Sequence, residues 1–340
     1  MDGNIFDYLE WRGDLPFEQS ELNAIDALIF SCLSYMNYVR AKGKSQSLAE
    51  AYEITRTLPK LDQFCGLELV REDTLKLAEK ISAYKRFKKI QVTDYIELHS
   101  KELEKQFSAM VFQIPKNSLF IAFRGTDNSL VGWKENLNMA FTDGTPAQLE
   151  ATEYVQQIAE KYPEKQIYLG GHSKGGNLSV WAAVHVSEKI QNRLKYVFNN
   201  DGPGFIRDFS DTPEFRNVES KILSFVPESS IIGVIMGTSS YLTIESTSVS
   251  VMQHHPFTWK IHGKHFVYKT EKTFSSKKIS GYLNNIIETM SPEELEEFVD
   301  QLYDDLRENK VETISDLKKN LWKNCRRIVR RFKIFREKRK

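Results

Sequence analysis

The sequence is poor in cysteine and contains no long hydrophobic run. Its 340 residues include three cysteines, Cys32, Cys65 and Cys325, which lie too far apart for a disulfide framework or a zinc knuckle. The most apolar run, residues 231–242, contains glycine, serine and threonine and falls far short of the roughly 20 residues that span a bilayer. No basic segment followed by an apolar one opens the sequence, so no secretory signal is expected. These absences favour a cytoplasmic protein.

The formal charge is nearly balanced, with 47 basic and 46 acidic residues, but it is unevenly distributed. Residues 318–340 contain twelve basic residues and one acid, which leaves 35 basic and 45 acidic residues in 1–317. Apolar residues make up 41% of the chain and aromatic residues 12%, which is ample for a packed core and excludes wholesale disorder. The length suits one large α/β domain with extensions, or two smaller domains.

Strand and helix patterns alternate through the middle of the chain. Apolar spacing predicts helices over residues 17–40, 46–58, 71–89, 133–141, 147–162 and 176–190. Short apolar segments predict strands over residues 90–96, 107–114, 118–123, 166–170, 194–199 and 221–226. This alternation predicts the α/β class, with a mostly parallel sheet covered by helices.

The segment Gly171-His-Ser-Lys-Gly175 lies between an expected strand and an expected helix. A nucleophile at a sharp strand-to-helix turn has a strained backbone, and nearby chain segments leave no room for side chains two residues away on either side. Glycine at both flanking positions meets this demand. The pattern indicates Ser173 as a nucleophile, whereas the plainer alternative is a glycine-rich turn with a capping serine.

A second segment, Phe120-Ile-Ala-Phe-Arg-Gly-Thr126, ends a buried strand upstream and is followed by Trp133. The second oxyanion donor of an α/β-hydrolase comes from this place, and the first is the N–H after the nucleophile. We therefore expect Lys174 to donate its N–H, and Thr126 its N–H and its hydroxyl. In the plainer alternative, this is an ordinary strand end and Arg124 forms a structural ion pair.

The sequence resembles the class 3 (fungal-type) lipases of the α/β-hydrolase superfamily. The resemblance lies in Phe-Arg-Gly-Thr, the downstream tryptophan and Gly-His-Ser-x-Gly-Gly. The sequence is even more similar to a group of uncharacterised bacterial lipase-like proteins. That similarity lies in residues 4–13, 200–204 and 253–254. The resemblance covers about residues 1–290, including an N-terminal helical region, 1–89. It implies an α/β-hydrolase fold and a Ser-His-acid hydrolase that acts on an ester, with no metal or organic cofactor.

The order of a triad in this fold is serine, acid, histidine, and the histidines after Ser173 are His185, His254, His255, His262 and His265. His185 lies inside the helix that follows Ser173 and is expected to point away from the site. His254 and His255 follow the last expected core strand, where a catalytic histidine belongs. The resemblance has Gln-His, a variable residue and Pro-Phe at this place, which selects His254 as the base; His255 and His265 are the alternatives.

Two residues are candidates for the acid. Asp201 follows one expected strand and Glu228 follows the next. The resemblance implies an aspartate after the second strand, but Glu228, Ser229 and Ser230 stand there instead. We favour Asp201, because Asn199-Asn-Asp201 is an unusual run of polar residues at a strand end. In the alternative, Asp201 holds a glycine-rich turn and Glu228 is a solvated loop residue.

The substrate and the class of function stay open. Residues 231–237 are expected to line an acyl pocket, to form a lid or to belong to the core. The Lys174 side chain is expected either to favour an anionic head group or product, or to lie on the helix surface. A carboxylic ester, in particular a lipid ester, is the expected substrate. The alternatives are a thioesterase or peptidase with the same triad, and a non-catalytic lipase-like protein that binds lipid or a partner.

Residues 291–340 form an extension in which an acidic helix precedes the basic tail. Ser291-Pro-Glu-Glu294 predicts the start of that helix, with serine as the N-cap and glutamate closing a capping box. From residue 314 onward, apolar residues recur on one face of a basic amphipathic helix, which suits peripheral contact with an anionic membrane. Docking onto the acidic helix is the alternative. No nucleic-acid motif accompanies the tail, so nucleic-acid binding is not expected.

Overall fold

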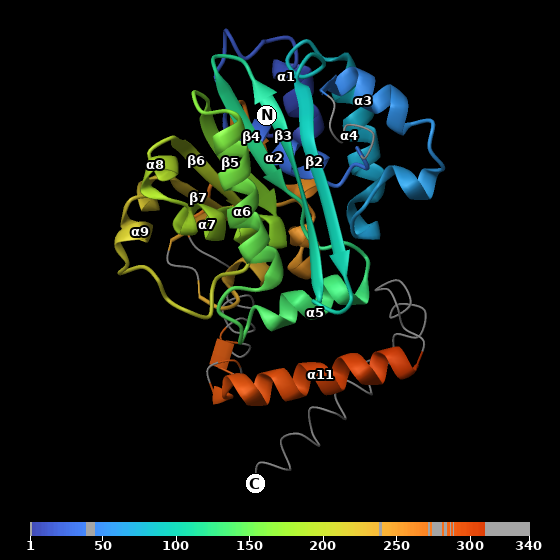
Figure 1. Ribbon diagram of the computed structural model, residues 1–340. Helices are drawn as coiled ribbons and strands as arrows, with labels where there is room; N and C mark the ends of the chain where they lie inside the picture. The colour runs from blue at the N-terminus through green and yellow to red at the C-terminus, as the bar shows by residue number, and fades with distance from the viewer. Residues whose placement is uncertain are drawn as a thin grey trace.

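A mixed β-sheet forms the centre of the protein (Figure 1). The computed structural model describes residues 2–38, 45–237, 240–270, 273, 281, 284–285, 287 and 289–309. In this part of the chain, eight strands follow one another across the sheet in sequence order: β1 Gln46–Ser47, β2 Gln91–Ser100, β3 Lys105–Ile114, β4 Ser118–Phe123, β5 Gln166–His172, β6 Leu194–Asn200, β7 Ile222–Pro227 and β8 Leu242–Ile244. Strands β1 to β4 pair antiparallel, and β4 to β8 pair parallel. A short hairpin, β9 Ile261–His262 and β10 His265–Phe266, lies outside this sheet.

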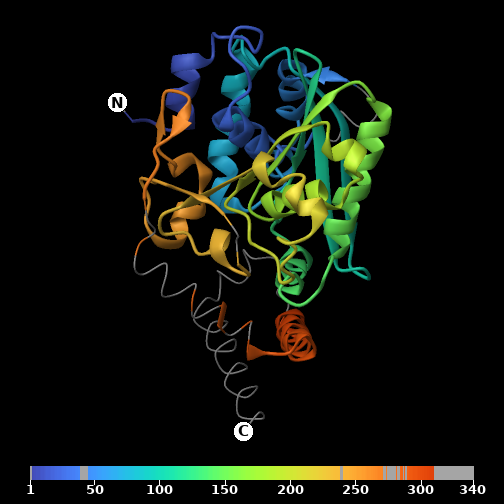
Figure 2. The same cartoon turned by 90° about the vertical axis from the view of Figure 1, so that its left-hand side faces the viewer.

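Helices cover both faces of the sheet (Figures 1 and 2). The helices α2 and α4 share one apolar core with the sheet, and α6 and α7 share the other. The longer helices are α1 Ile5–Arg12, α2 Ala24–Leu33, α3 Leu48–Thr55, α4 Arg71–Ala83, α5 Leu130–Asn138, α6 Pro146–Lys161, α7 Lys174–His185 and α11 Pro292–Glu308. The short helices α8 Glu188–Gln191 and α9 Pro213–Arg216 flank β6.

Strand β4 shows why the sheet is buried on both sides. All six of its residues are buried. Phe120 and Ala122 belong to the core beneath α2, whereas Leu119, Ile121 and Phe123 belong to the core beneath α6 and α7. Because successive side chains of a strand point to opposite faces, a continuous apolar run is what a sheet covered on both faces requires. The predicted strand over residues 118–123 is confirmed.

The N-terminal helices begin and end at different residues from those expected. Helix α2 begins at Ala24 rather than within residues 17–23, because the Asn23 side chain accepts the N–H of Ile25 and ends the preceding loop. Helix α4 ends at Ala83, so Arg86 lies beyond it. The Arg86 guanidinium is buried and pairs with Asp26 at 2.5 Å. Arg86, which was expected to lie in a helix over residues 71–89, thus forms a core ion pair that ties this loop to α2.

The acidic helix α11 begins as predicted, at Pro292 with Ser291 as the N-cap and Glu294 closing the capping box. It lies beside α5, at the end of the molecule where β5 leads into α7 (Figures 1 and 2). In the part of the chain described here, no helix is both long and apolar enough to cross a membrane. The basic segment 314–340 lies outside the described residues. The parallel strands, the covering helices and the turn between β5 and α7 form an α/β-hydrolase fold.

Candidate active site

Ser173 occupies a sharp turn between β5 and α7. Its backbone has φ 59° and ψ −131°, a conformation that is costly for a residue with a side chain and that is concentrated at functional sites. The two flanking glycines are required because there is no room for a side chain at either position. A Cβ on Gly171 would lie 2.2 Å from the carbonyl carbon of Gly175, and a Cβ on Gly175 would lie 2.1 Å from the carbonyl oxygen of Phe123. The strand–turn–helix context expected around this serine is present.

His254 and Asp201 meet at the same end of the sheet. The His254 Nδ1 atom lies 2.7 Å from Asp201 Oδ2. Because a carboxylate only accepts hydrogen bonds, Nδ1 carries the proton, and Nε2 of the neutral ring is left as a base. The Asp201 side chain is fully buried and also accepts a bond from the Ser230 hydroxyl at 2.7 Å.

Glu228, the other candidate acid, lies elsewhere. Its carboxylate pairs with Lys269 Nζ at 2.6 Å, and its backbone N–H pairs with the carbonyl of Ile244 on β8. The structure therefore brings Asp201, and not Glu228, to His254. The carboxylate of Glu228, the second candidate, is engaged by a lysine instead.

A glutamine that precedes the histidine ties the two loops together. Gln253 is buried, and its Oε1 accepts the N–H of Ser229 at 2.7 Å. Its backbone carbonyl accepts a bond from Trp259 Nε1 at 2.8 Å. The residue was visible in the sequence only as part of the Gln-His resemblance. Sequence reasoning missed Ser230 and Trp259 as contributors, and no local pattern points to either of them.

Thr126 lies beside the Ser173 turn, because β4 and β5 are neighbours. Phe123 pairs with Gly171 in the parallel register, so both strands end at the same edge. Thr126 is buried, and its hydroxyl oxygen accepts a bond from Asn136 Nδ2 at 2.6 Å. This leaves the hydroxyl proton available for another acceptor. Lys174 is the first residue of α7, where a backbone N–H has no acceptor within the helix.

The Lys174 side chain corrects both expectations made for it. It is 1% exposed, and its ammonium group pairs with the carboxylate of Glu135, which is 0% exposed. It also donates to the carbonyl oxygen of Gln106 at 2.6 Å. The side chain therefore lies neither on the helix surface nor where a head group or product would bind.

The sequence over residues 81–304 matches the Mbeg1-like family, and this match covers most of the chain. The chain belongs to the Mbeg1-like family. With the fold, this membership confirms the predicted relationship to lipase-like α/β-hydrolases. The match includes every residue of the site described above and ends inside α11.

Solved structures of fungal lipases are similar to this Mbeg1-like protein. The Rhizomucor miehei lipase in its propeptide complex is 15% identical, with a TM-score of 0.39 over 68% of this chain and 80% of the other. The Lip2 lipase from Yarrowia lipolytica is 12% identical, with a TM-score of 0.34 over 67% and 81%. Lipase II from Rhizopus niveus is 16% identical, with a TM-score of 0.33 over 59% and 80%. No curated protein matches the sequence.

The remaining histidines after Ser173 face other partners. His185 stacks on Trp181, with ring centroids 3.8 Å apart, and therefore points away from the Ser173 turn. His255 faces α4, where its Nε2 lies 3.4 Å from Asp73. His262 lies 3.1 Å from Asp2, and His265 is exposed on β10. His254 is thus the histidine that this structure joins to a buried carboxylate.

Arg124 forms the structural ion pair of the plainer alternative. Its buried guanidinium donates to Glu97 on β2 at 2.6 Å. Burial opposes the charge of Arg124 and is the largest single influence on it, but Glu97, Tyr95 and Cys65 together outweigh burial and raise the pKa of Arg124. This arginine therefore links β4 to β2 and supports the strand end that carries Thr126.

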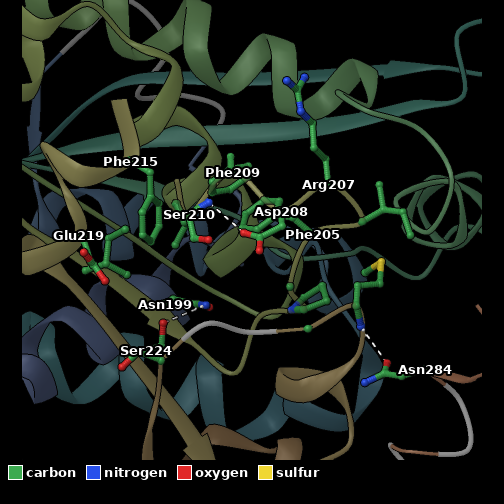
Figure 3. Close-up of a pocket in the computed structure, with 18 of the residues that line it drawn as sticks. Asn199, Phe205, Arg207, Asp208, Phe209, Ser210, Phe215, Glu219, Ser224 and Asn284 are labelled. Carbon is green, nitrogen blue, oxygen red and sulfur yellow. Dashed lines mark hydrogen bonds between the residues drawn. The ribbon is translucent and has the colours of Figure 1, made fainter. Parts of the chain in front are cut away.

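A cavity of about 450 Å³ lies beside the loop that follows Asp201 (Figure 3). Phe205, Phe209 and Phe215 form an aromatic wall, and Asn199 and Ser224 line the cavity from β6 and β7. Met236 and Gly237 also line it, whereas Gly233 packs against Asp201. Residues 231–237 thus contribute both to the support of the acid and to a cavity wall.

Proposed function

We propose that this protein is a serine hydrolase that cleaves carboxylic esters. The observation that carries the proposal is the 2.7 Å contact between His254 Nδ1 and Asp201 Oδ2. Asp201 is fully buried, so its carboxylate can hold the imidazole in one tautomer and one orientation, as the acid of a triad must. The strained turn at Ser173, on the adjacent strand end, supports Ser173 as the nucleophile.

The proposed mechanism uses residues of this chain alone. Ser173 Oγ attacks the ester carbonyl carbon while His254 Nε2 takes the hydroxyl proton. The N–H groups of Lys174 and Thr126, with the Thr126 hydroxyl, hold the oxyanion. The bond to the alcohol then breaks, and His254 returns the proton to the departing oxygen. Water next attacks the acyl-enzyme with His254 as the base, which releases the acid and restores Ser173.

We further propose that the cavity beside the acid loop, whose lining residues do not include Ser173 or His254, receives part of an acyl chain. Its aromatic wall of Phe205, Phe209 and Phe215 would contact methylene groups, and sites for apolar ligands are commonly cavities of this size class. We therefore propose that esters of fatty acids are better substrates than acetate esters.

Labelling with a fluorophosphonate probe tests the proposal. We expect the wild-type protein to be labelled at Ser173 and to hydrolyse medium-chain p-nitrophenyl esters, and Ser173→Ala to lose both properties. Ser179→Ala is the matched control, because Ser179 lies buried in α7, the helix that follows Ser173, and its hydroxyl donates to the Gly176 carbonyl. An unlabelled and inactive wild-type protein would favour a non-catalytic lipid-binding or partner-binding role. Faster turnover of acyl thioesters than of matched esters would favour a thioesterase.

We also propose that residues 314–340 place the enzyme against anionic lipid. The support is the sequence alone: a basic amphipathic segment with aromatic residues among its apolar positions. Sedimentation with anionic vesicles, comparing the full chain with a 1–313 truncation, tests this role. Binding by the full chain alone is expected. Equal sedimentation of both proteins would remove the role and favour docking within the molecule.

A further inference from the structure

We propose that Tyr35 and His172 are positioning residues that hold His254 in place; the inference rests on the proposed function. His172 is the last residue of β5 and directly precedes Ser173. It is buried, and its ring lies between Tyr35 and the His254 loop. Its Nε2 lies 2.8 Å from the backbone carbonyl oxygen of His254, and its Nδ1 lies 3.1 Å from the Tyr35 hydroxyl.

The two contacts of His172 determine where its proton resides. A carbonyl oxygen only accepts, so His172 Nε2 must carry hydrogen and donate it to His254. In the neutral ring, Nδ1 then accepts, so the Tyr35 hydroxyl must donate to it. Burial keeps the ring neutral, because it lowers the pKa of His172 well below its ordinary value, and nearby His254 lowers that pKa further. The result is a directed relay from Tyr35 through His172 to the His254 backbone.

His172 also supports the His254 ring itself. The two imidazoles are 4.5 Å apart between centroids, with an angle of 33° between their planes. His254 is therefore held at three points: its Nδ1 by Asp201, its carbonyl by His172 and one ring face by the same His172. Three such contacts limit both the translation of the loop and the rotation of the ring, which sets the direction in which Nε2 points.

A neutral neighbour suits the proposed chemistry. His254 becomes positively charged in each half of the reaction, and a second cation stacked on it would oppose that step. Because the relay uses both ring nitrogens of His172, with one donating and the other accepting, it favours the neutral form of that ring at the point of contact.

Tyr35 connects the relay to the oxyanion side. A Cβ on Gly125 would lie 2.1 Å from the Tyr35 hydroxyl oxygen, so this oxygen packs directly on the residue before Thr126. Tyr35 also stacks on Phe64, with ring centroids 5.9 Å apart, which fixes the ring that carries the hydroxyl. One hydroxyl thus touches both the loop of the proposed oxyanion donor and the ring that holds the proposed base.

Kinetics of three variants test the positioning role. His172→Phe keeps an aromatic ring against His254 but loses both hydrogen bonds. We expect its kcat to fall by about 10²-fold with KM unchanged, because a displacement of about 1 Å can cost this much. In His172→Gln, the side-chain amide can both donate and accept, so part of kcat should return. Tyr35→Phe should lower kcat by a smaller factor.

Tyr154→Phe is the matched control for Tyr35→Phe, because Tyr154 is also buried and its hydroxyl donates to a backbone carbonyl, that of Asp94. It should leave kcat unchanged. Thermal unfolding of each variant identifies proteins that fail to fold. Wild-type kcat in folded His172→Phe would overturn the positioning role, provided that Ser173→Ala abolishes turnover.

A spectroscopic readout separates this inference from the proposed function. In the full-length protein labelled with ¹⁵N-histidine, we expect His172 to show the Nε2–H tautomer and Tyr35→Phe to admit the Nδ1–H form. A wild-type Nδ1–H tautomer would overturn the relay whether or not the protein is an enzyme. If the tautomer is as expected but Ser173 neither reacts nor turns over esters, the proposed function fails. The relay is then a structural contact only, and the positioning role fails with it.

Discussion

The buried pair of Lys174 and Glu135 yields a prediction about stability. The Lys174 ammonium uses all three of its protons, on the Glu135 carboxylate and on both oxygens of Gln106. The Glu135 carboxylate in turn accepts the N–H groups of Gln106 at 2.9 Å and Ala147 at 2.8 Å. Both side chains are excluded from solvent, so the pair is fully satisfied and has no water to replace a lost partner.

Lys174→Met should destabilise the fold by about 3–5 kcal/mol, because it leaves a buried carboxylate without its cation. Glu135→Gln should cost a similar amount, since it leaves a buried ammonium group without its anion. In the double variant no buried charge remains, and the glutamine still accepts one N–H and donates to the Gln106 carbonyl. We expect it to cost about 1–2 kcal/mol, the usual loss for one or two imperfect buried hydrogen bonds.

Urea unfolding followed by tryptophan fluorescence measures these free energies. Lys80→Met is the matched control, because Lys80 pairs with Glu10 at 2.9 Å with side chains that are 34% and 57% exposed. A pair this exposed should contribute less than about 1 kcal/mol. Two results would contradict this reasoning. In one, Lys174→Met lowers the free energy of unfolding no more than Lys80→Met does. In the other, the loss in the double variant equals the sum of the two single losses.

Four further predictions concern the site, the substrate and the basic tail. Asp201→Asn should lower kcat for p-nitrophenyl esters by about 10⁴-fold, because the wrong tautomer of His254 is then favoured. Glu228→Gln should leave kcat near the wild-type value. Equal losses in the two variants would contradict the assignment of Asp201 as the acid. Gly175→Ala should lower the melting temperature, since its Cβ would lie 2.1 Å from the Phe123 carbonyl oxygen, and unchanged melting would contradict the tight turn. Ile206 lies at the cavity rim and is 40% exposed. Ile206→Trp should therefore raise KM for long-chain esters more than for acetate esters. An equal effect on both would show that the acyl chain does not bind in this cavity. Residues 314–340 should be needed for binding to anionic vesicles, as measured by sedimentation of the 1–313 truncation.

The turn at Ser173 could be predicted because its physical requirements appear in consecutive residues. Gly171 and Gly175 are needed where β5, α7 and β4 approach one another, and the sequence shows both. Strand β4 was predictable for the same reason, since burial on both faces appears directly as an unbroken apolar run. Features of this kind depend on neighbours along the chain, which a sequence pattern records.

The acid could not be settled from such patterns, because its partner is distant in the sequence. Asp201 and Glu228 each follow a buried strand, so both positions look alike locally. The bond between Gln253 and the Ser229 N–H places the histidine loop over Asp201, and Lys269 engages Glu228. Neither contact leaves a trace in the residues around the two acids.

The polar residues at the end of β6 include both structural residues and the proposed acid. The turn that Asp201 was expected to hold in the alternative is held by Asn199, whose Oδ1 accepts the Gly202 N–H at 2.9 Å. Asn200 ties the strand to β5 by donating to the Gly171 carbonyl at 3.1 Å. The two asparagines thus provide the structural contacts, which leaves the Asp201 carboxylate for His254.

Helix α5 connects the acidic helix α11 to the site. The distribution of charge along the sequence did not predict this connection. On its inner side, Glu135 binds the Lys174 side chain, and Asn136 donates to Thr126. On its outer side, Lys134 pairs with Asp300 of α11 at 2.7 Å, and Leu130 packs against Leu306. Both proposed oxyanion residues are therefore held by consecutive residues of a helix whose other face is covered by α11. Because Lys134, Glu135 and Asn136 are adjacent, a shift of α11 that moved Lys134 would act on the same backbone that supports Lys174 and Thr126. The acidic helix is accordingly part of the support of the site rather than a separate appendage.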